Sequence, residues 1–180
     1  MAEAKLQSGY STERDTSAAL LDLGGLCARG AVAGLVAGVA FILANMWYAS
    51  AHGKPAVAPF LDISTVFHGS DMPNLSNAPF DVVVGLVTHV GLSMLFGIVF
   101  GVGLHVLRLG RRPLVVVGAA LVYGLALYVV NFQILGRLFF PWFVNPKGPN
   151  QGFELWIHPV AYGLFLAPFF VNLRLTAHHH

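Results

Sequence analysis

The sequence predicts an all-α polytopic membrane protein, a bundle of four transmembrane helices with both termini in the cytoplasm. Its 180 residues are 56% hydrophobic and only 10% charged, with a mean hydropathy of +0.70. Soluble domains carry about 25% charged residues to solvate their surface. In addition, four apolar segments have the roughly 20 residues that a helix needs to cross a bilayer. We therefore expect an integral membrane protein.

The four predicted spans contain no Asp, Glu, Lys or Arg and are rich in Gly and Ala. Because backbone polar groups in hydrocarbon must be paired within the segment, such continuous runs predict helices and not barrel strands. The spans are Gly30–Ala49, Val82–Leu107, Leu114–Leu135 and Leu155–Leu173. They form one membrane domain, residues 30–175, after an N-terminal tail (1–29) with a short juxtamembrane helix. The C-terminal tail (176–180) ends in three histidines, typical of the remnant of a purification tag.

The distribution of cations predicts the orientation of the spans. Seven Lys and Arg residues fall on the side of the two termini and the loop between the second and third spans, whereas three fall in the outer loops, 50–81 and 136–154. The positive-inside rule places the first group in the cytoplasm, in what we expect to be a prokaryotic inner membrane. The net charge of +2 is too small and too dispersed for nucleic-acid binding.

The outer loops contain two local features. A short helix is predicted from Pro59, which suits a first helical turn, to Gly69, which suits a helix end. Its apolar side, which includes Phe60 and Phe67, either lies in the membrane interface or caps the bundle. Six aromatic residues crowd the second outer loop and its exit, Trp142 and Trp156 among them, as expected of an interfacial belt.

Small residues recur along the spans at four-residue spacing. Such spacing lets helices approach closely, which is a large part of what drives association in lipid. The positions predicted to pack in this way are Gly30, Gly34, Gly38, Gly85, Ser93, Gly97, Gly101 and Gly124. Packing of the helices within one chain is the simpler interpretation. A face for a second copy or for another membrane subunit is the alternative.

Two intramembrane histidines, His89 and His158, are the main candidates for chemistry, because ionisable residues in a span raise a functional hypothesis. Both are predicted toward the outer side, and neutral imidazole ligates haem iron, copper or zinc. A b-type haem or a copper ion held by His89 and His158 is therefore one hypothesis. Tyr162 lies one helical turn after His158 and could orient a neighbouring group. A hydrogen bond to a neighbouring helix is the commoner role of such a histidine.

Other redox arrangements have less support. His105 lies 16 residues after His89, a rotation of about 160° in a straight helix, so the two cannot share one face. His52 and His68, with nearby methionines, could join a copper site, but no clustered ligand motif is present.

Catalytic signatures are absent from the sequence. It has no GxSxG, HExxH or phosphate-binding loop. No carboxylate or lysine lies within a predicted span, which disfavours proton pumps and carboxylate-coupled transporters. The leading interpretation therefore includes neither enzymatic activity nor a cofactor.

Several phrases together resemble a loosely defined group of small, uncharacterised four-helix prokaryotic membrane proteins. They include the glycine-rich string from Gly30, the string His-Val-Gly-Leu-Ser-Met-Leu-Phe-Gly from His89, Phe-Pro-Trp-Phe from Phe140, and His-Pro-Val-Ala-Tyr-Gly from His158. The resemblance extends over most of the chain. It implies the four-helix fold and places His89, Asn131 and His158 in the shared pattern, but it implies no activity.

By elimination, the sequence favours a non-enzymatic membrane protein that acts by interaction. It would serve as an accessory or assembly subunit of a larger membrane complex, plausibly respiratory, in contact with lipid and with other subunits or further copies of itself. The alternative is a haem- or metal-binding electron-transfer protein that uses His89 and His158. A channel or carrier for small solutes is the third hypothesis.

Overall fold

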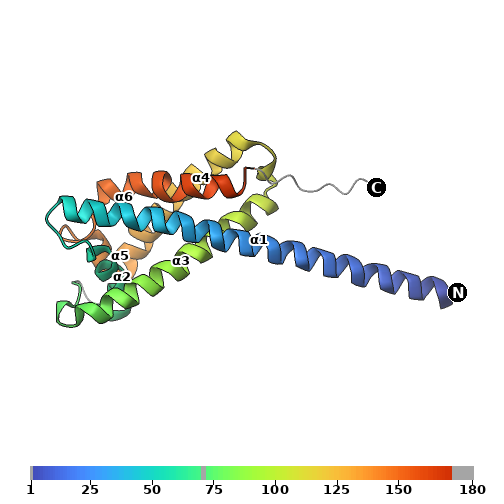
Figure 1. Cartoon of the computed structure of the whole chain (residues 1–180), viewed down its shortest axis with the longest axis horizontal. Helices are drawn as coiled ribbons and strands as arrows, with labels where there is room; N and C mark the ends of the chain where they lie inside the picture. The colour runs from blue at the N-terminus through green and yellow to red at the C-terminus, as the bar shows by residue number, and fades with distance from the viewer. Residues whose placement is uncertain (1, 70–71, 172–180) are drawn as a thin grey trace.

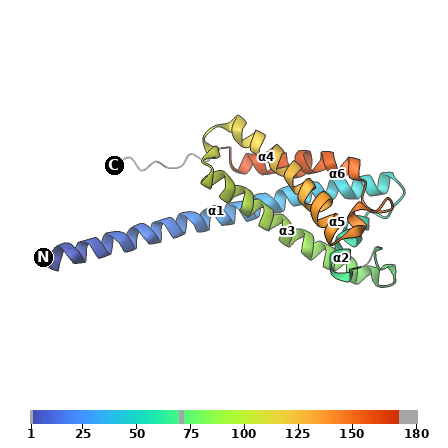
Figure 2. The same ribbon diagram turned by 180° about the vertical axis from the view of Figure 1, so that it is seen from behind.

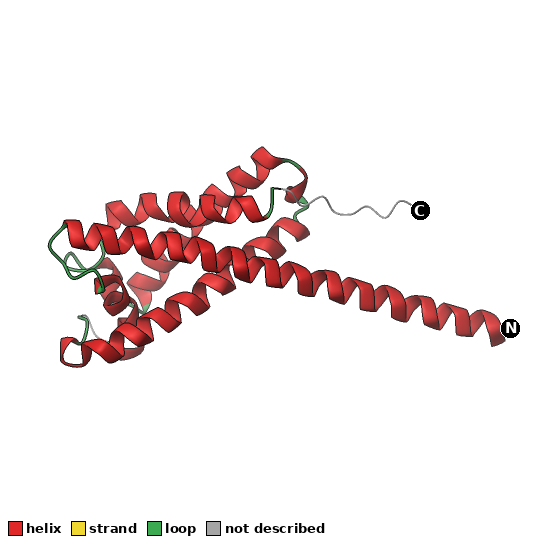
Figure 3. Cartoon of the chain, in the orientation of Figure 1, coloured by secondary structure: helices red, strands yellow, loops and turns green. Residues whose placement is uncertain are grey.

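The computed structural model describes residues 2–69 and 72–171, and every regular element within them is helical (Figure 3). The all-helical class predicted from the sequence is therefore confirmed for the described residues. Three helices in this part of the chain are long and apolar enough to cross a membrane: Leu23–Ala51, Leu75–Val106 and Pro113–Leu138. The predicted tail, 176–180, and Arg174 lie outside the described residues.

The first span belongs to a helix that is much longer than predicted. Helix α1 (Ala2–Ala51) is continuous, so the juxtamembrane helix expected within residues 1–29 is not a separate element. No proline interrupts this stretch of sequence, and a helix therefore has no reason to end there. Its N-terminal part extends well beyond the other helices (Figure 1).

The second and third spans follow a short connecting region. A 3-10 turn, η1 (Leu75–Asn77), leads into α3 (Ala78–Val106), and a second one, η2 (Leu109–Arg111), turns the chain into α4 (Pro113–Tyr128). The third span then continues through a π-helical segment, η3 (Val129–Leu135), into α5 (Gly136–Leu138). A last 3-10 turn, η4 (Pro141–Val144), lies in the loop that follows.

The predicted fourth span is helical but irregular. Helix α6 (Gln151–Ile157), the π-helical segment η5 (His158–Gly163), helix α7 (Leu164–Leu166) and the 3-10 turn η6 (Ala167–Phe169) follow one another without a gap. Pro159 and Pro168 contribute to this irregularity, because proline has no backbone N–H for helix hydrogen bonding. This run is not among the three candidate spans of the described residues. Polar residues such as Gln151, Glu154 and His158 make it less apolar than those three helices.

The helices form a bundle in which α1 packs along α3, and the C-terminal segment from η5 to η6 packs against both α1 and α4. The α3–α4 connection and the described C-terminal end lie toward the N-terminal part of α1 (Figures 1 and 2). The C-terminal end of α1, together with α2 and α5, lies at the opposite end. Much of the buried core consists of small and aromatic residues of α1, α3, α4 and the C-terminal segment, such as Ala33, Phe100, Ala120 and Phe170.

The small residues lie at contacts between elements of the same chain. A Cβ atom on Gly34 would overlap the carbonyl oxygen of Ser93, and one on Gly97 would overlap the backbone of Gly30 and Gly34. The other predicted positions have comparable neighbours. Gly38 faces Ser93 and His89, Gly85 faces the backbone of Phe60, Gly101 faces the ring of Phe170, and Gly124 faces the backbone of His158 and Pro159. These small-residue faces are therefore occupied within the chain.

Helix α2 (Ala58–His68) is the short helix expected in the first long loop. Pro59 stands in its first turn, and Gly69 ends it with a φ of 58°, a conformation that glycine adopts without strain. Phe60 is buried against α3, whereas the Phe67 side chain is 65% exposed. The helix therefore packs against the bundle with its Phe60 side, and Phe67 does not share that packing.

Large apolar side chains remain exposed along the outward faces of all three long helices. Trp47 on α1, Val87 on α3 and Val122 on α4 are each about two-thirds exposed. Soluble monomers rarely expose continuous apolar surface on this scale. These faces are suited to contact with lipid, which agrees with the apolar character of the spans.

Candidate functional site

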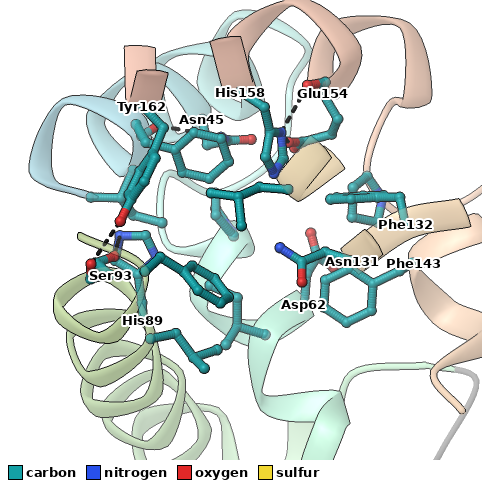
Figure 4. A pocket seen from close by; sticks show the side chains of 18 of the residues that line it. Asn45, Asp62, His89, Ser93, Asn131, Phe132, Phe143, Glu154, His158 and Tyr162 are labelled. Atoms are coloured by element: carbon teal, nitrogen blue, oxygen red, sulfur yellow. Dashed lines mark hydrogen bonds and ion pairs between the residues drawn. The ribbon is translucent and has the colours of Figure 1, made fainter. Parts of the chain in front are cut away.

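A cavity of about 450 Å³ lies at the end of the bundle where α2 packs. Apolar side chains from α1, α2, α3, η3 and the C-terminal segment make up most of its lining. Figure 4 shows the polar side chains around it: His89, Ser93 and Tyr162 to one side, His158 and Glu154 above, and Asp62 and Asn131 below. This volume, with a mostly apolar lining and a few convergent polar groups, is typical of small-molecule sites.

Two of the surrounding segments are π-helical. Asn131 and Phe132 line the cavity from η3, and His158 and Tyr162 line it from η5. A π turn adds a residue to the helical turn and so changes the direction of the side chains around it, and such turns are frequent at functional sites. In η5 the change begins where Pro159 follows His158. Both departures from α-helical geometry therefore lie where side chains face the cavity.

His158 is almost fully buried, with 5% of its surface exposed. Its Nδ1 donates a hydrogen bond of 2.8 Å to the backbone carbonyl of Glu154, so in the neutral ring Nε2 keeps its lone pair. The rings of Phe41 and Phe132 contact the imidazole with centroids 4.6 and 5.5 Å away. Gly124 lets α4 lie directly against the backbone of His158, which fixes its position. The side chain is thus held as a hydrogen-bond acceptor or metal ligand would be.

His89 faces the same cavity from α3. Its Nε2 donates a hydrogen bond of 2.9 Å to the carbonyl of Gly38 on α1, and the Ser93 hydroxyl lies 3.5 Å from the same nitrogen. Phe41 contacts this ring too, with centroids 6.1 Å apart. The structure therefore brings His89 and His158 to one cavity, but it uses Nε2 of His89 to join two helices.

Tyr162 also lies at the cavity, but its hydroxyl does not contact a histidine. The hydroxyl donates a 2.6 Å hydrogen bond to the backbone carbonyl of Ser93 on α3. The partner of this hydroxyl, which the sequence does not specify, is thus the backbone of another helix. Tyr162 therefore ties the C-terminal segment to α3 beside the cavity.

Glu154 is a cavity residue that the sequence analysis assigned to an outer loop. It stands one position before the fourth predicted span, in the first turn of α6, whose N-terminus is capped by the Asn150 side chain. The side chain is only 4% exposed, and its Oε2 has no hydrogen-bond partner. That oxygen lies 3.3 Å from Nδ1 of His158, which already donates its hydrogen to a carbonyl. Burial, and secondarily Asp62, raises the pKa of Glu154 to about 8.

Asp62 is the second carboxyl group at the cavity, and α2 supplies it. The indole Nε1 of Trp142 donates a 2.6 Å hydrogen bond to its Oδ1. Burial raises the pKa of Asp62, while this hydrogen bond and the charge of Lys54 act in the opposite direction. Trp142 itself is only 5% exposed. It therefore positions a cavity carboxylate, and the expectation that it belongs to an interfacial belt is wrong.

Other aromatic residues of that loop differ in exposure. Phe139 and Trp156 are 63% and 72% exposed, whereas Phe140 and Phe143 line the cavity. Sequence reasoning missed Asp62, Trp142 and Glu154 because it treated the loops as lying outside the bundle. No local signal marked Asp62, because in a helix that begins at Pro59 it lies about 160° from Phe60, away from the predicted apolar side.

The remaining histidines considered for metal binding are separated. Nδ1 of His52 donates a hydrogen bond of 2.8 Å to the carbonyl oxygen of Tyr48. Nε2 of His68 lies 2.8 Å from Oδ1 of the buried Asp81. His105 is exposed on α3. In the described ranges no group of three or more His, Cys, Asp or Glu side chains is arranged to hold a metal ion. The copper site considered from His52 and His68 therefore has no geometric support there.

No protein-family model matches the chain, and no curated protein or solved structure was found to be similar to it. The resemblance stated from the sequence strings stays a prediction. The case for function therefore depends on the cavity and on the residues that line it.

Proposed function

We propose that this chain is an integral membrane protein that binds a small, mostly apolar molecule in the cavity lined by His89, His158, Asp62 and Glu154. In this proposal the irregular segment that begins at Leu155 forms the fourth span, as predicted from the sequence, and both termini face the cytoplasm. The cavity then opens from the outer half of the bilayer. The membrane is the inner membrane of a prokaryote, as the sequence predicts.

The proposed orientation has two supports. The arginine-rich connection between α3 and α4, with Arg108 and Arg112, lies at the same end of the bundle as the N-terminal part of α1. Asp62, Asp81 and Glu154 lie toward the other end, beside α2. Cations concentrate at the cytoplasmic ends of membrane helices, so this separation favours an outer location for the cavity.

The observation that carries the proposal is the combination of an apolar cavity with a buried polar atom that has no partner. Oε2 of Glu154 receives no hydrogen bond from the protein. Leaving a buried polar group unpaired costs about 1–3 kcal/mol, so such groups usually have a role or an additional partner. A ligand in the cavity would supply that partner.

Calorimetric titration in a neutral detergent tests the proposal. The probes are four naphthalene compounds that differ in one group: hydroxymethyl, acetyl, aminomethyl or carboxyl. At least one should bind saturably at a single site. Leu135→Trp, which fills the cavity from η3, should abolish binding, whereas Ile134→Trp on its outward-facing neighbour should not.

Comparison of the two tryptophan variants also controls for partition of the probes into detergent, because partition would be the same in both. If no probe binds the wild-type chain, or if binding survives Leu135→Trp unchanged, the proposal fails.

A single haem is the second candidate, and one observation favours it. Nδ1 of His158 donates to a backbone carbonyl, which leaves Nε2 oriented as in many metal-bound histidines. His158 and His89 would be the ligands, and His89 would first have to give up its bond to Gly38. A haem would supply one-electron chemistry when bound.

Absorption spectra of oxidised and dithionite-reduced protein test the haem candidate. A Soret band that shifts on reduction, and that His158→Ala removes while His105→Ala does not, would support it. A protein purified after growth with added haem precursor that shows no such band would overturn it.

The accessory-subunit role predicted from the sequence stays a prediction, and so do its partners. Ligand binding does not require such a role and does not conflict with it. The small-residue faces of α1 and α3 are occupied within the chain, so a partner would contact the outward apolar faces of the spans.

A further inference from the structure

We infer that the cavity selects an organic cation, an apolar molecule with an ammonium group that lies between the carboxyl groups of Asp62 and Glu154. The inference rests on the proposed ligand-binding function and narrows it to one class of ligand. Three features of the lining carry it: the sign of its charged groups, the unpartnered oxygen of Glu154 and the ring of aromatic side chains.

Apart from histidine, the ionisable groups that line the cavity are carboxyl groups, and a bound ammonium ion favours their charged form. Asp62 and Glu154 are both present, and no lysine or arginine is found among the described residues of the lining. Lys54 acts on Asp62, but its ammonium group donates to the carbonyls of Lys147 and Gly148 and does not line the cavity. The interior therefore attracts positive charge and repels a carboxylate or phosphate ligand.

The polar atoms left over are hydrogen-bond acceptors. Oε2 of Glu154 has no donor, and Nε2 of a neutral His158 keeps its lone pair because Nδ1 donates to the backbone. An ammonium group has up to three N–H donors and no acceptor. A ligand of this kind matches both atoms, whereas a ketone or an ether would supply only further acceptors.

Aromatic side chains complete the surroundings. Phe41 and Phe132 contact His158, and Phe143 packs edge-on against Phe132 with centroids 5.4 Å apart. All three line the cavity. The faces of aromatic rings attract cations, most strongly where water is excluded, and they also pack against an apolar ligand body. Aromatic rings combined with carboxylates favour organic cations over hydrated inorganic ones.

Matched probes on the wild-type chain test this inference without any mutation. The aminomethyl naphthalene should bind about tenfold more tightly than the hydroxymethyl compound, since one additional charge-assisted contact is worth about that factor. Its N-trimethylated form should also bind, through the aromatic rings, and the carboxyl compound should bind most weakly. All titrations use the same neutral detergent at pH 8.5, where most of Glu154 is ionised and most of the ammonium probe keeps its charge.

Two variants locate the effect. Asp62→Asn and Glu154→Gln should each reduce the advantage of the ammonium probe over the alcohol several-fold, while leaving the affinity for the alcohol within about twofold. Asp81→Asn is the matched control, because Asp81 is buried and paired with His68 but does not line the cavity. It should leave the advantage unchanged.

The outcomes separate the two proposals. If the alcohol, the ketone or the carboxylate binds at the cavity as tightly as the ammonium probe, the cation inference is overturned and ligand binding stands. If the advantage persists in Glu154→Gln and Asp62→Asn, the inference is also overturned. Absence of all saturable binding overturns the proposed function itself.

Discussion

The two halves of the contact between α1 and α3 differ in how closely the helices approach each other. Around Gly30 and Gly34 the two backbones touch, and no side chain separates them. Two turns further along α1, Phe41 and Asn45 line a cavity instead. Glycine and alanine let membrane helices approach closely, whereas the larger side chains of Phe41 and Asn45 need more space between the helices. One pair of helices therefore supplies both a rigid crossing and a site.

His89, Ser93 and Gly38 mark the boundary between these halves. Gly38 is close to both Ser93 and His89, and its carbonyl accepts the His89 hydrogen bond. The close crossing therefore orients a histidine at the cavity. This arrangement predicts that substitutions at the close contact around Gly34 lower folding stability most. Substitutions at the cavity should act mainly through the buried carboxyl groups of Asp62 and Glu154.

The largest effect is expected at the crossing. Gly34→Ala should lower the free energy of unfolding by about 3 kcal/mol or more, because the added Cβ would overlap the Ser93 carbonyl and backbone cannot move aside easily. Thermal unfolding in detergent measures this effect. Gly91→Ala on the outward side of α3 has open space and should be neutral or slightly stabilising. Equal stability of the two variants would contradict the close crossing.

A smaller effect, dependent on pH, is expected from Glu154. Burial, followed by Asp62, raises its pKa in the folded chain to about 8 from an ordinary value of 4.5. Below pH 4.5 both folded and unfolded states keep the proton; as the pH rises toward 8, only the unfolded state loses it, so folding stability falls across this window. Glu154→Gln removes this penalty. It should stabilise the protein by on the order of 2 kcal/mol at pH 9 and very little at pH 4.

Unfolding curves at the two pH values, with wild type beside Glu154→Gln, check this prediction. If Glu154→Gln has the same effect at pH 4 and pH 9, Glu154 does not titrate as its burial requires.

The smallest effect is expected at Trp142. Trp142→Phe keeps an aromatic ring but removes the N–H that donates to Asp62. The loss of this hydrogen bond should lower the free energy of unfolding by about 1–2 kcal/mol. It should also raise the pKa of Asp62 further. Trp156→Phe, at an exposed position, should change stability by less than about 0.5 kcal/mol. Thermal unfolding of both variants at pH 7 measures the difference, and equal effects would remove Trp142 from the site.

The sequence alone determined the helical class and the approximate position of each apolar segment. Hydrophobic length and the absence of charge are local properties, and they do not depend on how the helices are packed. The short helix from Pro59 to its end at Gly69 was equally predictable, because a proline start and a glycine end are local signals. His89 and His158 could also be found, since an ionisable residue is conspicuous in an apolar span.

Only the tertiary structure decided which residues surround the cavity. Asp62, Trp142 and Glu154 belong to segments that the sequence places between spans, and they reach the cavity because α2 and the α6 turn pack against the bundle. The partners of Tyr162 and His89 are backbone carbonyls, which leave no trace in a sequence. The rotation of a helix in lipid is not fixed by composition, because lipid and protein interior are both apolar. Contacts between helices fix it, and those contacts placed the two carboxyl groups inside.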